Sequence, residues 1–441
     1  MMDVSKSWRD SISKFDDLFR HIAFDTSDPH TIATARRILR IVELKPTELE
    51  VFIRSTFRDL VGNTKLRVAA EELAHRLALQ SGRFVYFELQ THSPRFGQYF
   101  NLPAPKLRFL HYNCTTSPVL FASSFPNLRT LHTSMNKIIK IPPSSLSNLV
   151  ELQLLNSHRA QRSSKASIFA LLRSTPRLEA LSLSGFTWFS CVSTVPEPVD
   201  LANLISVHFT DCHLPEFLLG LRFPQLRKFS FLGSDPTPDE NTPPSTVCNT
   251  NFFTRLQACP LPILDQRAVN HIFISTDDNG DKIEFTLRLV SGPDSKYQFT
   301  ATMAWEKWEN WEGHLEQFIG SVVKRVRLTS SVCLYLFHYV DHTEVPYLPL
   351  LRLPQINVLC TAGWFTPTAF KLLAGSGNSA CFPPLPRLKC FCFRGDELQA
   401  STEEVQSSVE HCLRSRFDKR RPLAIRCWVP YGDETRLVIP R

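Results

Sequence analysis

The sequence predicts an α/β fold in which tandem repeats stack short strands into a parallel sheet. Three observations lead to this prediction. One apolar pattern recurs along much of the chain, and strand-like and helical segments alternate before it. In addition, 31 prolines and only 15 glycines among 441 residues indicate many short elements separated by turns. The low glycine count also argues against enzymes built on glycine-rich phosphate loops.

The recurring pattern is a proline or polar lead-in followed by L-x-x-L-x-L. Early copies lie 21 to 29 residues apart, at or slightly beyond the period of leucine-rich repeats. Alternation places two apolar side chains on one face of each strand, and only stacked neighbours can bury them. We therefore predict a curved leucine-rich-repeat solenoid over about residues 21–430, strands inside, rather than unrelated strands of a β-sandwich. The first apolar residues of the copies are Leu107, Leu128, Leu149, Leu178, Leu204, Leu226, Ile356 and Leu388.

Before the pattern begins, strand-like and helical segments alternate. Residues 21–25, 47–54 and 84–89 have strand-like alternation. Between them, 31–42 and 64–80 have helical periodicity, and Asp28 is placed to cap the first helix. Such strand–helix–strand units favour right-handed parallel crossovers.

A different pattern interrupts the repeats. Residues 233–246 are mostly proline, serine, threonine and acidic residues, with almost no apolar side chain, which predicts a surface loop. Residues 271–290 then read as two strands joined by a hairpin turn at Asn279-Gly280, and 297–303 as a third strand.

A helix is predicted over 305–323. Its apolar face would carry Trp305, Trp308 and Trp311, for which core packing is favoured over an aromatic ligand cage. Residues 321–330 are then expected to resume the repeat phase. Near the end, the sequence predicts a helix over 403–417 and a last strand over 423–430.

The charge is distributed in blocks. Fifty basic and 42 acidic residues give a net charge of +8, yet residues 233–320 hold 13 acidic and 6 basic residues, which sum to −7. A uniformly basic nucleic-acid binder would lack such an acidic block, so no nucleic-acid partner is expected. Without a secretory apolar segment or an 18-residue apolar run, we expect no membrane span, and the 12 cysteines read as reduced thiols of a cytoplasmic or nuclear protein.

Motifs of known chemistry are missing from the sequence. It contains no G-x-G-x-x-G, G-x-x-x-x-G-K, G-x-S-x-G or H-E-x-x-H, so catalysis and cofactor binding are not expected. The run 277–281 resembles part of a calcium loop but reads better as a turn. Neither His338 with His342 nor Cys390 with Cys392 has the further ligands of a metal site.

The repeat phase itself predicts a binding surface. The residue between the paired apolar positions of each strand points to the inner, concave face, where curved solenoids bind their partners. The alternative is that these residues are only solvated. Histidines in this row predict sensitivity to mild acid. The candidate partner face consists of His111, His132, Gln153, Ser182, His208 and Ser230.

Residues 4–27 resemble the second half of an F-box, a Val-x-x-x-Trp-Arg helix followed by Asp-Leu-Phe and a short strand. The matching residues are Val4, Trp8, Arg9, Leu18, Phe19, Ile22 and Phe24. With the repeats, the chain is similar to the fungal F-box/leucine-rich-repeat proteins. The similarity in repeat pattern extends over nearly the whole chain, and the F-box match covers residues 4–27.

This resemblance implies a substrate-recognition subunit of a cullin–RING ubiquitin ligase. The F-box of such proteins binds a Skp-family adaptor, here through Trp8, Leu18 and Phe19, and the repeats hold a protein substrate. The family's opening Leu-Pro-x-Glu helix has no counterpart in this sequence, so adaptor binding is expected to be weak or lost. The alternative is a leucine-rich-repeat scaffold without ligase coupling. The expected domains are a partial F-box-like segment (1–27), two solenoid parts (28–232 and 321–441) and an insert between them (233–320).

Overall fold

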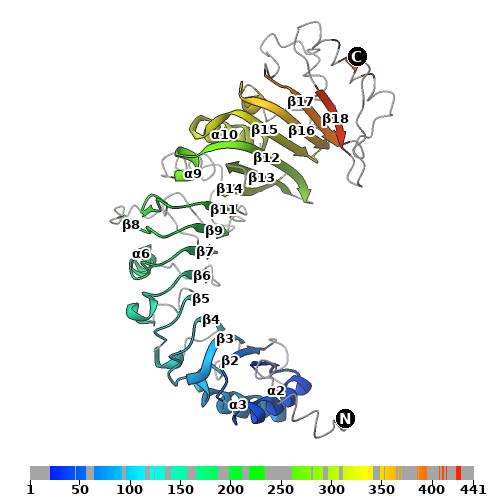
Figure 1. Ribbon diagram of the computed structural model, residues 1–441. Coiled ribbons are helices and arrows are strands. Elements are labelled where there is room, and N and C mark those ends of the chain that lie inside the picture. Colours follow the sequence, from blue (N-terminus) through cyan, green and yellow to red (C-terminus); the bar gives the residue numbers. More distant parts are fainter. Residues whose placement is uncertain are drawn as a thin grey trace, which may run out of the picture. The chain divides into compact units, whose positions relative to one another are not determined.

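The computed structural model consists of two compact units, Met1–Leu204 and Ile205–Arg441, and each combines helices with a largely parallel sheet (Figure 1). It describes residues 20–44, 46–55, 64–91, 96–114, 120–123, 125–134, 141–155, 165–186, 198–210, 218–233, 261–279, 282–291, 296–306, 311–340, 348–351, 353–363, 366, 369, 385, 387–394, 407, 410–411, 414 and 424–428.

In the first unit, each main strand pairs in parallel with the next strand along the chain. This confirms the predicted strands and the parallel order of the first repeats. The strands are β1 (His21–Asp25), β2 (Leu49–Arg54), β3 (Phe84–Thr91), β4 (Phe109–Cys114), β5 (Thr130–Ser134), β6 (Glu151–Leu155) and β7 (Ala180–Ser184), with the short β8 (Val199–Asp200) after them. The helices are α2 (Pro29–Val42), α3 (Thr64–Ala78), α4 (Phe96–Tyr99) and α6 (Lys165–Arg173), with the 3-10 turns η2 (Ser81–Arg83), η3 (Leu120–Ser123) and η4 (Pro143–Leu146).

Helix α2 begins as the sequence predicts. The Asp28 carboxylate accepts a hydrogen bond from the backbone N–H of His30 at 2.8 Å, and Pro29 occupies the first turn, where its missing N–H costs nothing. Ile32, Ala35 and Leu39, spaced three to four residues apart, form the buried stripe.

The eight leading apolar residues of the repeats are all buried, none more than 3% exposed. Asparagines keep the repeats in phase. The amides of Asn127, Asn148 and Asn203, each directly before a leading leucine, donate to a proline carbonyl of the preceding repeat at 2.7 to 3.0 Å. The lead-in position therefore has a structural role, because its backbone carbonyl accepts the bond from the next repeat. The accepting residues are Pro105, Pro126 and Pro176.

In the second unit, the spatial order of the strands departs from the chain order. The order is β9 (Ser206–Thr210), β11 (Lys228–Gly233), β14 (Tyr297–Glu306), β13 (Lys282–Ser291), β12 (Ala268–Asn279), β15 (Arg327–His338), β16 (Ile356–Gly363), β17 (Cys390–Arg394) and β18 (Ala424–Trp428). The β14–β13 and β13–β12 pairs are antiparallel and the remaining pairs are parallel. The unit also contains β10 (Leu221–Arg222), α9 (Pro262–Asp265), α10 (Trp311–Arg325) and α11 (Leu348–Leu351).

The predicted hairpin is confirmed, since Asn279 and Lys282 are register partners across its turn. Its strands lie within the sheet, because β14 pairs in parallel with β11 and β12 pairs in parallel with β15. The predicted insert thus contributes three adjacent strands to the sheet that also holds the repeat strands of this unit.

The predicted bounds of the following helix are wrong. Trp305 belongs to strand β14, helix α10 runs from Trp311 to Arg325, and the next strand starts only at Arg327. The strand continues to Glu306 because it stays paired with β13 in a regular register. The predicted apolar face of the helix is correct in its second half, where Leu315, Phe318, Ile319 and Val322 are buried.

Several predicted features lie outside the described residues. They include Trp8, Trp308, Leu18 and Phe19, the loop after Gly233, and most of the helix predicted over 403–417. The last two residues of the F-box-like match, Ile22 and Phe24, are buried on β1. Within the described segments, no helix has both the length and the apolar content to cross a membrane.

Candidate functional site

Side chains on the strands of the first unit alternate between a buried face and a half-exposed one, which we call the open face. Along the open face, Glu88, His111, His132, Gln153 and Ser182 are successive register partners from β3 to β7. Strand pairing thus aligns the four predicted first-unit residues in one row and adds Glu88 at its start.

The remaining two residues of the predicted face, His208 and Ser230, belong to the second unit. They are register partners on β9 and β11, so the pairing predicted between them is present. The His208 ring nitrogen Nε2 lies 3.0 Å from the Thr210 hydroxyl.

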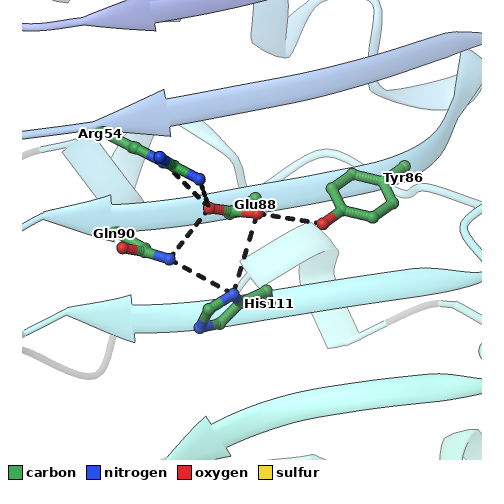
Figure 2. Close-up of polar contacts among 5 residues, drawn as sticks. All are labelled: Arg54, Tyr86, Glu88, Gln90 and His111. Atoms are coloured by element: carbon green, nitrogen blue, oxygen red, sulfur yellow. Dashed lines mark hydrogen bonds and ion pairs between the residues drawn. The ribbon is translucent and has the colours of Figure 1, made fainter. Parts of the chain in front are cut away.

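Glu88 is the centre of a polar cluster that the repeat pattern did not reveal (Figure 2). Its side chain is 6% exposed, and three neighbours donate hydrogen bonds to its carboxylate. Arg54 donates to Oε1 from Nε and Nη2 at 3.2 and 3.1 Å, and Gln90 donates to the same oxygen at 2.9 Å. The Tyr86 hydroxyl donates to Oε2 at 3.0 Å. These bonds and the arginine charge offset the cost of burying a carboxylate.

His111 closes the other side of this cluster. Its Nδ1 lies 3.9 Å from Glu88 Oε2 and 3.5 Å from the Gln90 amide nitrogen. Burial lowers the pKa of His111, and this outweighs the opposing effect of Glu88, while His132 and Arg54 lower it further. His111 therefore stays neutral to a lower pH than an ordinary histidine, and the sensitivity of the row to mild acid stays a prediction.

Stacked rings run beside the polar row. The centroid of the Tyr86 ring lies 4.6 Å from that of Phe52, with the planes tilted by 31°, and 4.1 Å from that of Phe109, with the planes nearly parallel at 5°. His132 continues the ladder, with its ring edge-on to Phe109 at 5.0 Å. Burial and the bond to Glu88 raise the pKa of Tyr86 to about 12, so its hydroxyl remains a donor at neutral pH.

Polar and charged contacts frame the open face. Glu50 forms an ion pair with Arg20 at 2.8 Å and lies 2.9 Å from His21 Nδ1, and Glu151 lies 3.4 Å from His132 Nε2. The Arg54 side chain is 63% exposed although it contacts Glu88, so it presents positive charge to solvent. The open face thus holds hydrogen-bond donors, acceptors and flat apolar rings in fixed positions. Such a surface is suited to non-covalent recognition of a partner.

Within the described segments, no three histidine, cysteine or acidic side chains already converge as a metal site. No protein-family model matches this chain, and no significant sequence match to a curated protein was found. The function is therefore inferred from the resemblance in the sequence and from the open face itself.

The shifted pKa of His111 predicts a pH-dependent stability. Because the folded state lowers this pKa below its unfolded value, the unfolded chain binds the proton first as the pH falls. The contribution of His111 to the free energy of unfolding is fully present above the ordinary histidine pKa of about 6.5. It is lost as the pH falls from that value toward the lower pKa that His111 has in the folded protein. The free energy of unfolding, measured in urea between pH 7.5 and 5, should therefore fall less steeply for His111→Gln than for the wild type. Equal slopes in the two proteins would contradict the assignment.

Proposed function

We propose that this chain is a non-catalytic substrate-recognition subunit of a cullin–RING ubiquitin ligase, a leucine-rich-repeat solenoid that holds a protein on its open face. The observation that carries the proposal is the register-aligned row from Glu88 to Ser182 beside the stacked rings of Phe52, Tyr86 and Phe109.

The open face has the composition of a protein-binding surface. Aromatic and arginine side chains supply most of the energy at protein interfaces, and Tyr86, Phe109 and Arg54 stand together here. Their neighbours hold them in place: the Tyr86 ring stacks on Phe109 and contacts Phe52 at a tilt of 31°, and its hydroxyl is bonded to Glu88. Such pre-organisation reduces the entropy lost on binding.

The repeat architecture supports the same proposal. The buried leading leucines, the asparagine bonds between successive repeats and the parallel pairing from β4 to β7 are what a leucine-rich-repeat solenoid requires. Solenoids present extended surfaces that bind macromolecules rather than small enclosed ligands.

Ligase coupling rests on the F-box resemblance at 4–27, with Trp8, Leu18 and Phe19 as adaptor contacts. A titration of the 441-residue chain with a purified Skp-family adaptor separates the two functions. Saturable binding supports the ligase subunit, whereas no binding at millimolar adaptor leaves the scaffold without ligase coupling.

Substrate recognition is tested by two matched double variants. Gln153→Arg with Ser182→Arg places two bulky cations on the open face, and Ala33→Arg with Thr34→Arg places the same charges on the exposed side of α2. Proteins captured by the wild type should bind the open-face variant at least about tenfold more weakly, which is 1.4 kcal/mol. The α2 variant should bind them as the wild type does. Equal capture by all three proteins would show that partners bind elsewhere.

A further inference from the structure

A group of cysteines lies on one face of the sheet in the second unit. Cys390 and Cys392 alternate on β17 with the buried Phe391 and Phe393, so both thiols lie on the half-exposed side of the strand. Their sulfur atoms are 3.6 Å apart. Cys360 on β16 is the register partner of Cys392 and is also half-buried. We call these three residues the thiol cluster.

The sulfurs of the thiol cluster are thiols and not disulfides. Residues two apart on an extended strand have Cα atoms separated by about 6.6 Å, near the upper limit of about 6.8 Å for disulfides. A bond between Cys390 and Cys392 would therefore strain β17, which pairs with strands on both sides. The strand geometry thus disfavours a disulfide between these two thiols.

We propose that Cys390 and Cys392 form a binding site for Cu(I), with Cys360 as a third ligand. Metal–thiolate bonds of about 2.3 Å allow two sulfurs on one ion to be separated by up to about 4.6 Å, and the observed 3.6 Å lies within this range. Thiolates are soft ligands, which favour Cu(I).

Copper(I) fits this site better than Zn²⁺ does. A structural zinc ion takes four protein ligands, and no described group of three metal-binding side chains is already in place. Copper(I) is satisfied by two or three thiolates. At 3.6 Å apart, the sulfurs of Cys390 and Cys392 would subtend an angle of roughly 100° at the metal, which suits a trigonal rather than a linear complex. Rotation of the Cys360 side chain, one strand away at about 4.8 Å, would bring the third ligand.

The binding step balances as an exchange of protons for the metal ion. Two thiols release two protons to solvent and form two S–Cu bonds, which leaves a bis-thiolate complex with one negative charge. Arg394 lies two residues beyond Cys392 on the same half-exposed side of β17. Its positive charge would attract and partly neutralise the negative charge of the complex. On the strand beyond β16, Tyr335 is the register partner of Cys360, and its ring stacks on Phe273 at 4.3 Å.

The test measures copper transfer from a coloured chelator. The reduced full-length chain is titrated without oxygen into Cu(I) held by bicinchoninate, and the loss of chelate absorbance reports the copper removed. The wild type should remove one equivalent. Cys390→Ser and Cys392→Ser should each weaken binding by more than about 100-fold, beyond the 10–100-fold typical of residues that only support a ligand.

A matched control and a second measurement keep the outcome decisive. Cys114→Ser, which changes a cysteine on β4 in the first unit, should bind as the wild type does. If a serine variant fails to fold, alkylation of the wild type decides, because one equivalent of Cu(I) should protect Cys390 and Cys392 from iodoacetamide in peptide mass spectra. The proposal is overturned if Cys390→Ser/Cys392→Ser binds copper as tightly as the wild type. It is also overturned if copper protects neither residue, or if either is found in a disulfide in reduced glutathione.

Discussion

Leu131→Asp is expected to unfold the sheet of the first unit around β5. Leu131 is fully buried, and its register partners are the buried Leu110 and Leu152. Removing the leucine side chain costs about 2–5 kcal/mol, and an unpaired carboxylate adds a desolvation cost of several kcal/mol. The sum approaches the whole stability of a typical domain, about 5–15 kcal/mol. The measurement is the urea midpoint of far-ultraviolet circular dichroism, which should fall sharply or disappear.

Two further variants separate the effect of burial from that of charge. Leu131→Ala should cost about 2–5 kcal/mol, because it creates a cavity without adding charge. Ser182→Asp places the same carboxylate on the half-exposed open face of β7 and should change stability by no more than about 0.5 kcal/mol. If Leu131→Asp melts as Ser182→Asp does, Leu131 does not face the core.

The repeat pattern predicted the strands and their buried face because it has a direct physical cause. Each leading leucine must be buried by the next repeat, so residues such as Leu128 and Leu149 recur at intervals that a reader of the sequence can detect. The cap of α2 at Asp28 and the turn after Asn279 were predictable for a similar reason, since both depend on residues adjacent in sequence.

The polar cluster depends on residues far apart in sequence and was missed. Strand β3 lacks the repeat template, and nothing near Glu88 in the sequence indicates that Arg54 and His111 would be its neighbours. The same holds for Cys360, which lies thirty positions before Cys390 and joins the thiol cluster only through the pairing of β16 with β17. Register between strands, rather than spacing along the chain, decides both sites.

The positions of the hairpin strands within the sheet also could not be predicted from local sequence patterns. The alternating pattern predicted each strand correctly. It does not indicate which strands pair, and the structure pairs β14 with β11 and β12 with β15, both in parallel. The error at Trp305 has a related cause. Its helical spacing from the later tryptophans suggested a helix, whereas pairing with Ile283 on β13 holds its backbone in the sheet.

Gly363→Ala is expected to destabilise the second unit by roughly 2–5 kcal/mol. Gly363 ends β16 with a φ of +69°, a conformation that costs other residues about 1–2 kcal/mol. A Cβ atom there would overlap the backbone carbonyl of His338, its register partner on β15. Relieving such an overlap costs about 1–3 kcal/mol in addition. It would also displace the buried His338 ring, whose Nδ1 lies 2.5 Å from the Thr276 hydroxyl.

Gly320→Ala is the matched control in the same unit. Gly320 lies inside α10, and a Cβ atom built there meets no other atom within 4 Å. Alanine removes the entropic cost of glycine in a helix, so this variant should gain about 0.5–1 kcal/mol. Urea unfolding of the two variants should therefore shift in opposite directions from the wild type. A Gly363→Ala protein as stable as the wild type would show that the end of β16 does not have the backbone conformation or the close contact with His338 described above.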